Sequence, residues 1–177
     1  DDPQKSGLAL IFSKMKGLGQ KSPPRVKTSY IFWSWVGSFI GIFCVASITY
    51  RAGVPMMIGS FGASAVLLYS ALEGPLSQPR NLIGGHVISA IIAVAIYQML
   101  GKTDLSVALA VSLAIVAMLS TRTLHPPGGA TALIAVNTEQ GLSFVAYPVL
   151  AGALVLLVVA LFVNNIAPDR HYPKNWI

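Results

Sequence analysis

Charged residues are scarce in this chain. Asp, Glu, Lys and Arg make up 10% of the 177 residues, whereas ordinary soluble domains carry about 25%. Hydrophobic residues make up 54%, and the mean hydropathy is +0.68. A soluble fold of this length cannot bury so much apolar surface. The apolar runs are continuous rather than alternating, which argues against a transmembrane β-barrel. The composition therefore predicts an all-α membrane protein.

Cysteine and the common catalytic motifs are also nearly absent. Cys44 is the only cysteine, so the chain can form neither an intrachain disulfide nor a cysteine-based metal site. The sequence contains no H-E-x-x-H and no G-x-S-x-G, and its three histidines are scattered. Gly101-Lys102-Thr103 resembles the end of a P-loop, but Ile96 stands where the upstream glycine is required. We therefore expect neither an enzyme nor a cofactor.

Acidic residues are few, and the net charge is +6. Half of the Lys and Arg residues precede Thr28, so the excess predicts membrane topology rather than a nucleic-acid partner. Residues 1–29 form a basic N-terminal segment. Within it, Leu8, Ile11, Phe12, Met15 and Leu18 recur at helical spacing, with Lys14 and Lys16 between them. This pattern is typical of an amphipathic helix on anionic lipid, and a disordered tail is the alternative.

Six apolar segments follow, and about 20 helical residues are needed to cross a bilayer. They are Tyr30–Tyr50, Pro55–Leu72, Leu82–Leu100, Leu105–Thr121, Gly128–Val136 and Phe144–Asn164. The fifth covers only about 14 Å as a helix, so it is either re-entrant or a broken span entered by an extended segment 121–127. Six crossings with a cytoplasmic N-terminus place ten basic residues inside and two outside. This distribution favours the broken span and a cytoplasmic tail at 167–177.

An internal sequence repeat divides the predicted transmembrane domain, residues 30–166, into two units. Gly62-Ala63-Ser64-Ala65-Val66 lies 67 residues upstream of Gly129-Ala130-Thr131-Ala132-Leu133, and Gly85 falls on Gly152 at the same offset. The units, about 30–101 and 105–166, each contain three segments, so the second is inverted relative to the first. Inverted repeats with broken helices are typical of secondary transporters. The alternative is that small-residue patterns recur by chance in membrane helices.

The stretch from His125 to Leu133 breaks the backbone and restarts a helix at membrane depth. Such a break is tolerated only where protein or a water-filled cavity satisfies the freed peptide groups. Proline suits the first helical position, and glycines let a ligand approach the backbone. The helix N-terminus then offers N–H groups and partial positive charge to an anion. We predict an anion at the N–H groups of Gly128, Gly129 and Ala130, beside Thr131 and His125; a structural hinge is the alternative.

A second half-helix begins near Ser60. In an inverted repeat its N-terminus faces the first from the opposite side, so that Ser60, Gly62, Ala63 and Ser64 complete the predicted binding site. Close helix packing through these small residues is the alternative. Three further residues are candidates for supporting roles, because ionisable groups inside a membrane usually face a cavity: Arg80, His86 and Arg122. Interfacial anchoring for the arginines and a bond to a neighbouring helix for His86 are the alternatives.

The motif His125-Pro126-Pro127 within H-P-P-G-G-A-T-A resembles the signature of the HPP family of integral membrane proteins. Further matches are Ser60-Phe61-Gly62-Ala63-Ser64-Ala65, Gln78-Pro79-Arg80-Asn81, Gly84-Gly85-His86 and Arg170-His171-Tyr172-Pro173, so the resemblance covers roughly residues 30–175. It implies a nitrite carrier of a bacterial inner membrane or, in a plant, a chloroplast inner envelope. The expected partners are nitrite or a similar small anion and membrane lipid, with no nucleic acid; a homo-oligomer stays open. A passive anion channel and a non-transporting membrane scaffold are the alternatives.

Overall fold

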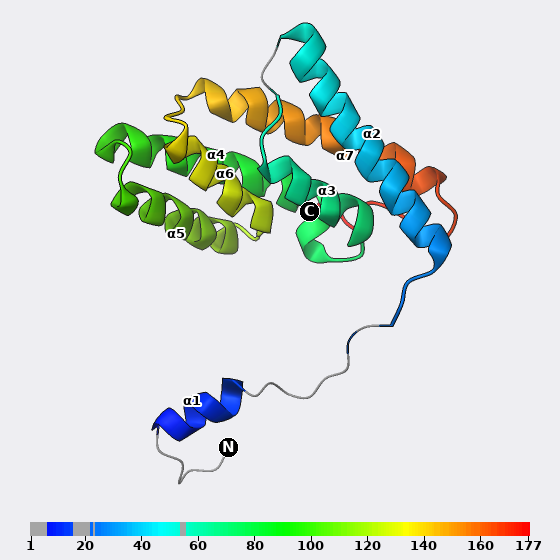
Figure 1. The fold of residues 1–177 in the computed structure, drawn as a ribbon, viewed down its shortest axis with the longest axis horizontal. Coiled ribbons are helices and arrows are strands. Elements are labelled where there is room, and N and C mark those ends of the chain that lie inside the picture. The colour runs from blue at the N-terminus through cyan, green and yellow to red at the C-terminus, as the bar shows by residue number, and fades with distance from the viewer. Residues whose placement is uncertain (1–6, 16–21, 23, 54–55) are drawn as a thin grey trace.

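The structure is a computed structural model that describes residues 7–15, 22, 24–53 and 56–177. These residues form helices and loops without any strand (Figure 1), which confirms the all-α prediction. Leu18 and the lysines at 16 and 21 lie outside the described residues. The elements in chain order are α1 (Gly7–Met15), α2 (Thr28–Ala52), α3 (Ser60–Ser70), η1 (Pro75–Ser77), α4 (Pro79–Leu100), α5 (Asp104–Ser120), α6 (Pro126–Asn137), η2 (Val145–Leu150) and α7 (Ala151–Ile166).

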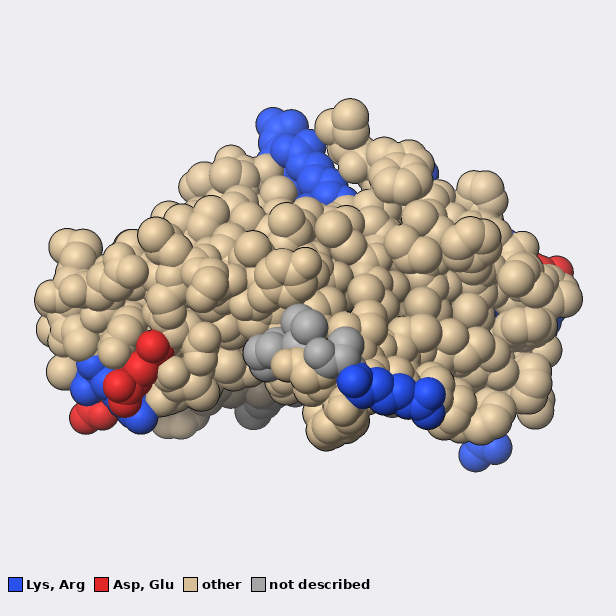
Figure 2. Space-filling model, turned by 90° about the horizontal axis from the view of Figure 1, so that it is seen from above, with Lys and Arg blue, Asp and Glu red and all other residues tan. Residues whose placement is uncertain are grey.

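Three helical stretches in the described part are long and apolar enough to cross a membrane: Thr28–Arg51, Pro79–Leu100 and Val145–Ile166. The third joins η2 to α7, and the extended backbone of Tyr147 interrupts it. The outer surface is apolar, and it carries large exposed side chains such as Phe39 and Phe162. Charged side chains occupy only a few separate places on it (Figure 2). Hydrocarbon rather than water suits this exterior, so the chain is a membrane protein.

Two helices are too short to cross alone. The 11 residues of α3 and the 12 of α6 cover roughly 17 and 18 Å at 1.5 Å per residue, against about 30 Å of hydrocarbon. The sequence predicts a longer segment from Pro55, which lies outside the described residues, but the helix begins only at Ser60. By contrast, α6 begins at Pro126, two residues before the predicted Gly128, because a proline at the first helical position loses no hydrogen bond there.

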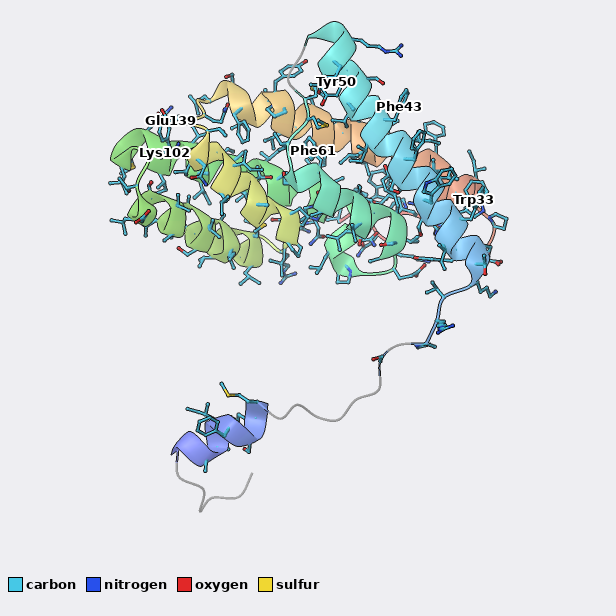
Figure 3. The ribbon with its side chains drawn as sticks, viewed as in Figure 1. Trp33, Phe43, Tyr50, Phe61, Lys102 and Glu139 are labelled. Carbon is cyan, nitrogen blue, oxygen red and sulfur yellow. The ribbon has the colours of Figure 1, made fainter. Side chains whose placement is uncertain are left out.

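Ion pairs mark the two ends of the bundle. The ion pairs Lys27–Asp169 and Lys174–Glu73 lie at one end of the bundle. The ion pair Lys102–Glu139, labelled in Figure 3, lies at the other end. The segment before α2 and the tail after α7 therefore lie at the same end. At that end Arg80 Nη2 donates to the carbonyl of Thr121, where α5 finishes. Residues 121–137 consequently run from this end of the bundle to the opposite one.

Small residues let the central helices approach closely. The cluster between α4, α5 and α6 contains six fully buried alanines, at positions 90, 93, 110, 114, 132 and 135. Alanine brings helix backbones near each other where lipid supplies no hydrophobic drive to associate. The second cluster joins α2, α3 and α7 around larger side chains such as Leu68, Tyr69 and Leu156. The two clusters together hold α3, α4 and α6 against one another.

The C-terminal tail fastens the loop between α3 and α4. The guanidinium of Arg170 is buried, and it donates to the carbonyls of Tyr69 and Tyr30 as well as to Ser34 and Asn164. Tyr172 donates its hydroxyl to the carbonyl of Ser77 at 2.7 Å. Desolvation by burial raises the pKa of Tyr172 and lowers that of Arg170. These bonds hold η1 in place, and η1 contributes a carbonyl to the site described next.

Candidate functional site

Five polar side chains meet at the centre of the bundle, each at most 1% exposed. We call them the buried polar cluster: Ser60, Ser64, His86, His125 and Thr131. They come from α3, α4, α6 and the residue that precedes α6. The ring of Phe61, labelled in Figure 3, packs edge-on against His86 with centroids 5.3 Å apart and closes one side.

The cluster is held by a continuous chain of hydrogen bonds. Ser64 Oγ lies 2.7 Å from His86 Nε2 and 2.9 Å from His125 Nε2, so one hydroxyl joins two rings whose centroids are 5.0 Å apart. His86 Nδ1 lies 2.7 Å from the hydroxyl of Thr131, which donates to Ser60 Oγ at 2.9 Å. His125 Nδ1 lies 2.8 Å from the carbonyl of Leu76 in η1. Three helices and a loop are thereby joined through side chains.

The Leu76 carbonyl fixes the tautomer of His125. A carbonyl oxygen only accepts hydrogen bonds, so Nδ1 of His125 must carry a proton. No Asp, Glu, Lys or Arg among the described residues forms an ion pair or hydrogen bond with the cluster. No third His, Cys, Asp or Glu in this part of the chain joins the two histidines as a metal-binding group. The cluster is thus a buried polar site without a fixed carboxylate or cation.

Glycines allow the two histidines to meet. A Cβ at Gly85 would lie 3.0 Å from the carbonyl oxygen of Thr123, and one at Gly84 would lie 2.6 Å from the Thr123 methyl carbon. A Cβ at Gly128 would lie 2.7 Å from the carbonyl oxygen of Gly85 and 2.8 Å from Ser89 Oγ. These glycines let α4 touch α6 and the segment before it, which brings His86 beside His125.

The predicted binding residues separate into two groups. The hydroxyls of Ser60, Ser64 and Thr131 come together with the histidines. Gly62, Ala63 and Ala130 are exposed on the outer surface, and Gly129 is partly exposed. Anion binding by either group stays a prediction.

The N-terminus of α6 has fewer free donors than the sequence predicts. Pro126 and Pro127 carry no N–H. The N–H of Gly128 donates to the carbonyl of His125 at 2.8 Å. The first turns of α3 and α6 overlap in antiparallel directions, since Ser60 at the start of α3 is bonded to Thr131, and Ser64 one turn later is bonded to His125 just before α6. Side-chain hydroxyls and imidazoles, rather than a row of N–H groups, therefore define the site.

The two candidate arginines lie outside the cluster. Arg80 is partly exposed and bonded to the end of α5, while Arg122 is exposed with a φ of 56°. The supporting residue nearest the centre is His86. Sequence reasoning missed the Leu76 carbonyl, because nothing in a sequence shows which backbone atom a distant side chain meets. It also missed the anchoring role of Arg170, whose place in the motif Arg170–Pro173 was the available signal.

A cavity of about 670 Å³ lies near the end of the bundle that carries Glu139. Its lining includes Thr138, Gln140 and Ser143 together with Ile58 and Gly59, which directly precede Ser60 in the chain. A Cβ at Gly59 would have a single neighbour within 4 Å, Ile134 Cδ1 at 3.9 Å. The cavity thus borders the residues next to Ser60, and no member of the buried polar cluster lines it.

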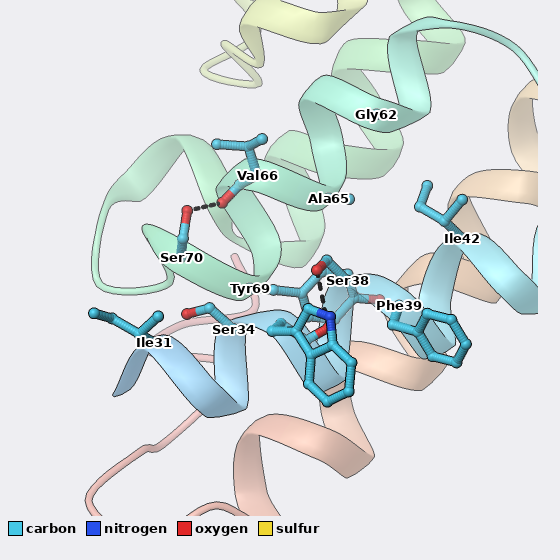
Figure 4. Close-up of a pocket in the computed structure, with 11 residues that line it drawn as sticks. Ile31, Ser34, Ser38, Phe39, Ile42, Gly62, Ala65, Val66, Tyr69 and Ser70 are labelled. Atoms are coloured by element: carbon cyan, nitrogen blue, oxygen red, sulfur yellow. Dashed lines mark hydrogen bonds between the residues drawn. The ribbon is translucent and has the colours of Figure 1, made fainter. Parts of the chain in front are cut away.

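A second hollow lies between α2 and α3 and is shown in Figure 4. It measures about 560 Å³, and its lining includes Ile31, Phe39, Ile42 and Val66. The lining is predominantly apolar, so it belongs to the lipid-facing exterior rather than to the polar cluster.

Comparison with known proteins agrees with this architecture. The profile of the HPP transmembrane region matches residues 23–173. A transmembrane protein of Dictyostelium discoideum is 49% identical over 93% of this chain and 57% of its own length. A second transmembrane protein of the same organism is 46% identical over 96% of this chain and 64% of its own length. The chain thus spans about three fifths of the curated relatives that it matches. No solved structure matches it. The chain belongs to the HPP family of membrane proteins.

Proposed function

We propose that this chain is a carrier, not an enzyme, that moves nitrite or a similar small monovalent anion across a membrane. The resemblance behind this proposal implies a bacterial inner membrane or a chloroplast inner envelope. The two Dictyostelium relatives are named only as transmembrane proteins, so the assignment of substrate rests on the family resemblance and on the chemistry of the site.

The buried polar cluster is the observation that carries the proposal. Burying polar groups inside a lipid-facing bundle is costly unless they are satisfied or have a function. Here three hydroxyls and two imidazoles gather at one point. Hydroxyl and imidazole groups donate hydrogen bonds to a small anion and hold it without a full positive charge. A weak site of this kind suits turnover, because conduction requires that the ligand also leave.

Access from one side supports transport over a purely structural role. The cavity beside Gly59 is lined in part by the hydroxyl and amide groups of Thr138, Ser143 and Gln140. An anion entering there reaches Ser60 first and then Thr131, its hydrogen-bond partner. The cluster itself is closed in this structure, so passage requires α3 and α6 to part. This closed centre favours a carrier over an open channel.

An internal exchange of contacts supports the two-unit arrangement. At the offset of 67 residues, α2, α3 and α4 correspond to α5, α6 and α7. The packed pairs α2–α3, α2–α7 and α3–α7 then correspond to α5–α6, α4–α5 and α4–α6, and all six pairs pack together. An arrangement that keeps its contacts when the units are exchanged is what a two-fold relation produces. The exchanged units provide the symmetric elements that alternating access needs.

Individual atoms follow the same exchange. Gly128 packs on Gly85, and Gly152 packs on the ring of Phe61; Phe61 corresponds to Gly128, and Gly85 to Gly152. A Cβ at Gly85 would approach the carbonyl of Thr123, and one at Gly152 would approach that of Met56 at 3.3 Å. Met56 and Thr123 also correspond. The course of residues 121–137 from end to end further supports the six-crossing topology with a broken fifth span.

Nitrite flux into proteoliposomes tests the proposal. Wild-type protein should give saturable nitrite uptake above that of protein-free vesicles. The protein-free vesicles measure how much nitrous acid, the neutral form of nitrite, permeates the lipid unaided. Competition by nitrate, formate and chloride then ranks the anions. A current that does not saturate indicates a passive channel, and no flux at all indicates a scaffold; either result overturns the carrier.

Two serine variants separate the site from the general fold. Ser64→Ala removes the hydroxyl between the histidines and should abolish uptake. Ser89→Ala is the matched control, since Ser89 is equally buried and its side chain makes only a 3.7 Å contact to Met118 Sδ. Normal uptake by folded Ser64→Ala protein would place the substrate path elsewhere.

A further inference from the structure

The hydrogen-bond chain through the buried polar cluster couples two imidazoles through one hydroxyl. Five contacts run in series, from the Leu76 carbonyl to His125, Ser64, His86, Thr131 and finally Ser60 Oγ. Each contact needs one hydrogen. Neutral His125, Ser64, His86 and Thr131 provide one each. With Thr131 donating to Ser60 Oγ, these four hydrogens fill four of the five contacts, so the series can accept one more.

We propose that the buried polar cluster binds one proton, and that this proton crosses the membrane together with the anion. The added proton completes the series. His125 then donates from both nitrogens, Ser64 donates to His86 Nε2, His86 Nδ1 donates to Thr131, and Thr131 donates to Ser60. No bond between heavy atoms changes, and the proton taken up on one side is released on the other. The coupling part of this inference rests on the proposed anion transport.

One proton, rather than two, fits the pair. A second proton would place two imidazolium rings with centroids 5.0 Å apart in a site without a counter-charge. Two rings joined by one hydroxyl are also expected to titrate as a unit. Around the pair, α3 and α6 present only hydroxyls and Phe61, and η1 presents a carbonyl.

The other titratable side chains of the neighbouring elements are turned elsewhere. Tyr69 on α3 donates to the carbonyl of Leu156, and Tyr97 on α4 donates to Glu139. Arg80 is bonded to the carbonyl of Thr121. Glu73 forms an ion pair with Lys174. Arg122 is exposed, and the hydroxyl of Tyr172 is bonded to Ser77. The positive charge on the protonated cluster thus has no negatively charged protein partner. A small anion supplies that negative charge. Proton and anion neutralise each other in a medium where either charge alone is costly.

Histidine ring shifts test the proton site without any substrate. Protein carrying nitrogen-15 in its histidines is titrated from pH 8 to pH 4 in detergent, with His171 as the exposed reference. The rings of His86 and His125 should change together and take up one proton between them. Ser64→Ala should separate the two rings. Independent titration of the pair in wild-type protein, or no change in either ring while the protein stays folded, overturns the inference.

Gradient-driven uptake tests the coupling. With the membrane potential held at zero, a pH gradient with an alkaline interior should drive nitrite accumulation above that of protein-free vesicles. A potential alone should drive none, because a proton and a monovalent anion cross as a neutral pair. His125→Gln and His86→Gln should lose the accumulation, and His171→Gln should keep it, each variant being checked for folding by its melting temperature.

The outcomes separate the two proposals. Saturable nitrite flux that ignores the pH gradient overturns the coupling and leaves anion transport standing. No wild-type flux overturns the proposed function and the coupling together, while the ring shifts alone decide whether the cluster binds a proton.

Discussion

The glycine pair at the start of α6 offers a sharp steric test. In Gly128→Ala the new Cβ would lie 2.7 Å from the carbonyl oxygen of Gly85, 2.8 Å from Ser89 Oγ and 3.0 Å from Met118 Sδ. One of these atoms belongs to backbone, so α4 and α6 must move apart. Overpacking of this kind costs about 1–3 kcal/mol. A loss of about 2 kcal/mol lowers the ratio of folded to unfolded protein roughly 30-fold.

Gly129→Ala is the matched control one residue away. A Cβ there meets nothing within 4 Å, and alanine in a helix gains about 0.5–1 kcal/mol over glycine. Melting temperatures of the two purified variants in the same detergent should therefore move in opposite directions, with Gly128→Ala below wild type and Gly129→Ala at or above it. A Gly128→Ala variant as stable as Gly129→Ala would refute the packing assigned to this break.

Three further substitutions test the surrounding structure. Gly152→Ala should lower the melting temperature as Gly128→Ala does, because its Cβ would overlap the ring of Phe61; a neutral effect would weaken the exchanged-unit arrangement. Arg170→Lys should release the C-terminal tail, since an ammonium cannot reproduce the several donors of the guanidinium, and trypsin should then cleave the tail faster in a time course. The raised pKa of Tyr172 in the folded state means that its contribution to stability is complete below about pH 10, the pKa of an exposed tyrosine, and is lost as pH rises beyond it. Tyr172→Phe should therefore flatten part of the fall in melting temperature above pH 10, and an unchanged slope would contradict the buried phenol.

Much of the fold could be predicted from the sequence, because segments that cross lipid must be continuously apolar. Continuous apolar runs predicted α2, α4 and α5 to within a few residues, and α6 begins two residues before the predicted Gly128. The segment expected from Pro55 proved harder, because the four residues before Ser60 are apolar yet not helical. Apolar composition indicates burial in lipid but does not distinguish extended from helical backbone. The extended backbone of Tyr147 was not predicted, for the same reason.

The site was predictable in its residues but not in its geometry. Small and hydroxyl side chains at the starts of two half-helices pointed to Ser60, Ser64 and Thr131, and the membrane setting pointed to His125 and His86. Which face of each helix turns inward depends on packing across 60 or more residues. Gly62 and Ala130 therefore carry the same sequence pattern as their neighbours yet lie outside. The second proline also leaves the α6 terminus poorer in N–H groups than a simple helix start.

The most direct test of the proposed anion site is the nitrite affinity of two threonine variants. Thr131→Val keeps the shape of a fully buried side chain and removes the hydroxyl that joins His86 to Ser60. Thr138→Val makes the same change at the exposed end of α6. Nitrite binding measured by calorimetry on folded protein should weaken at least tenfold in Thr131→Val and stay unchanged in Thr138→Val. Equal affinity in wild type and Thr131→Val would contradict the account, because the anion would then bind away from the buried polar cluster.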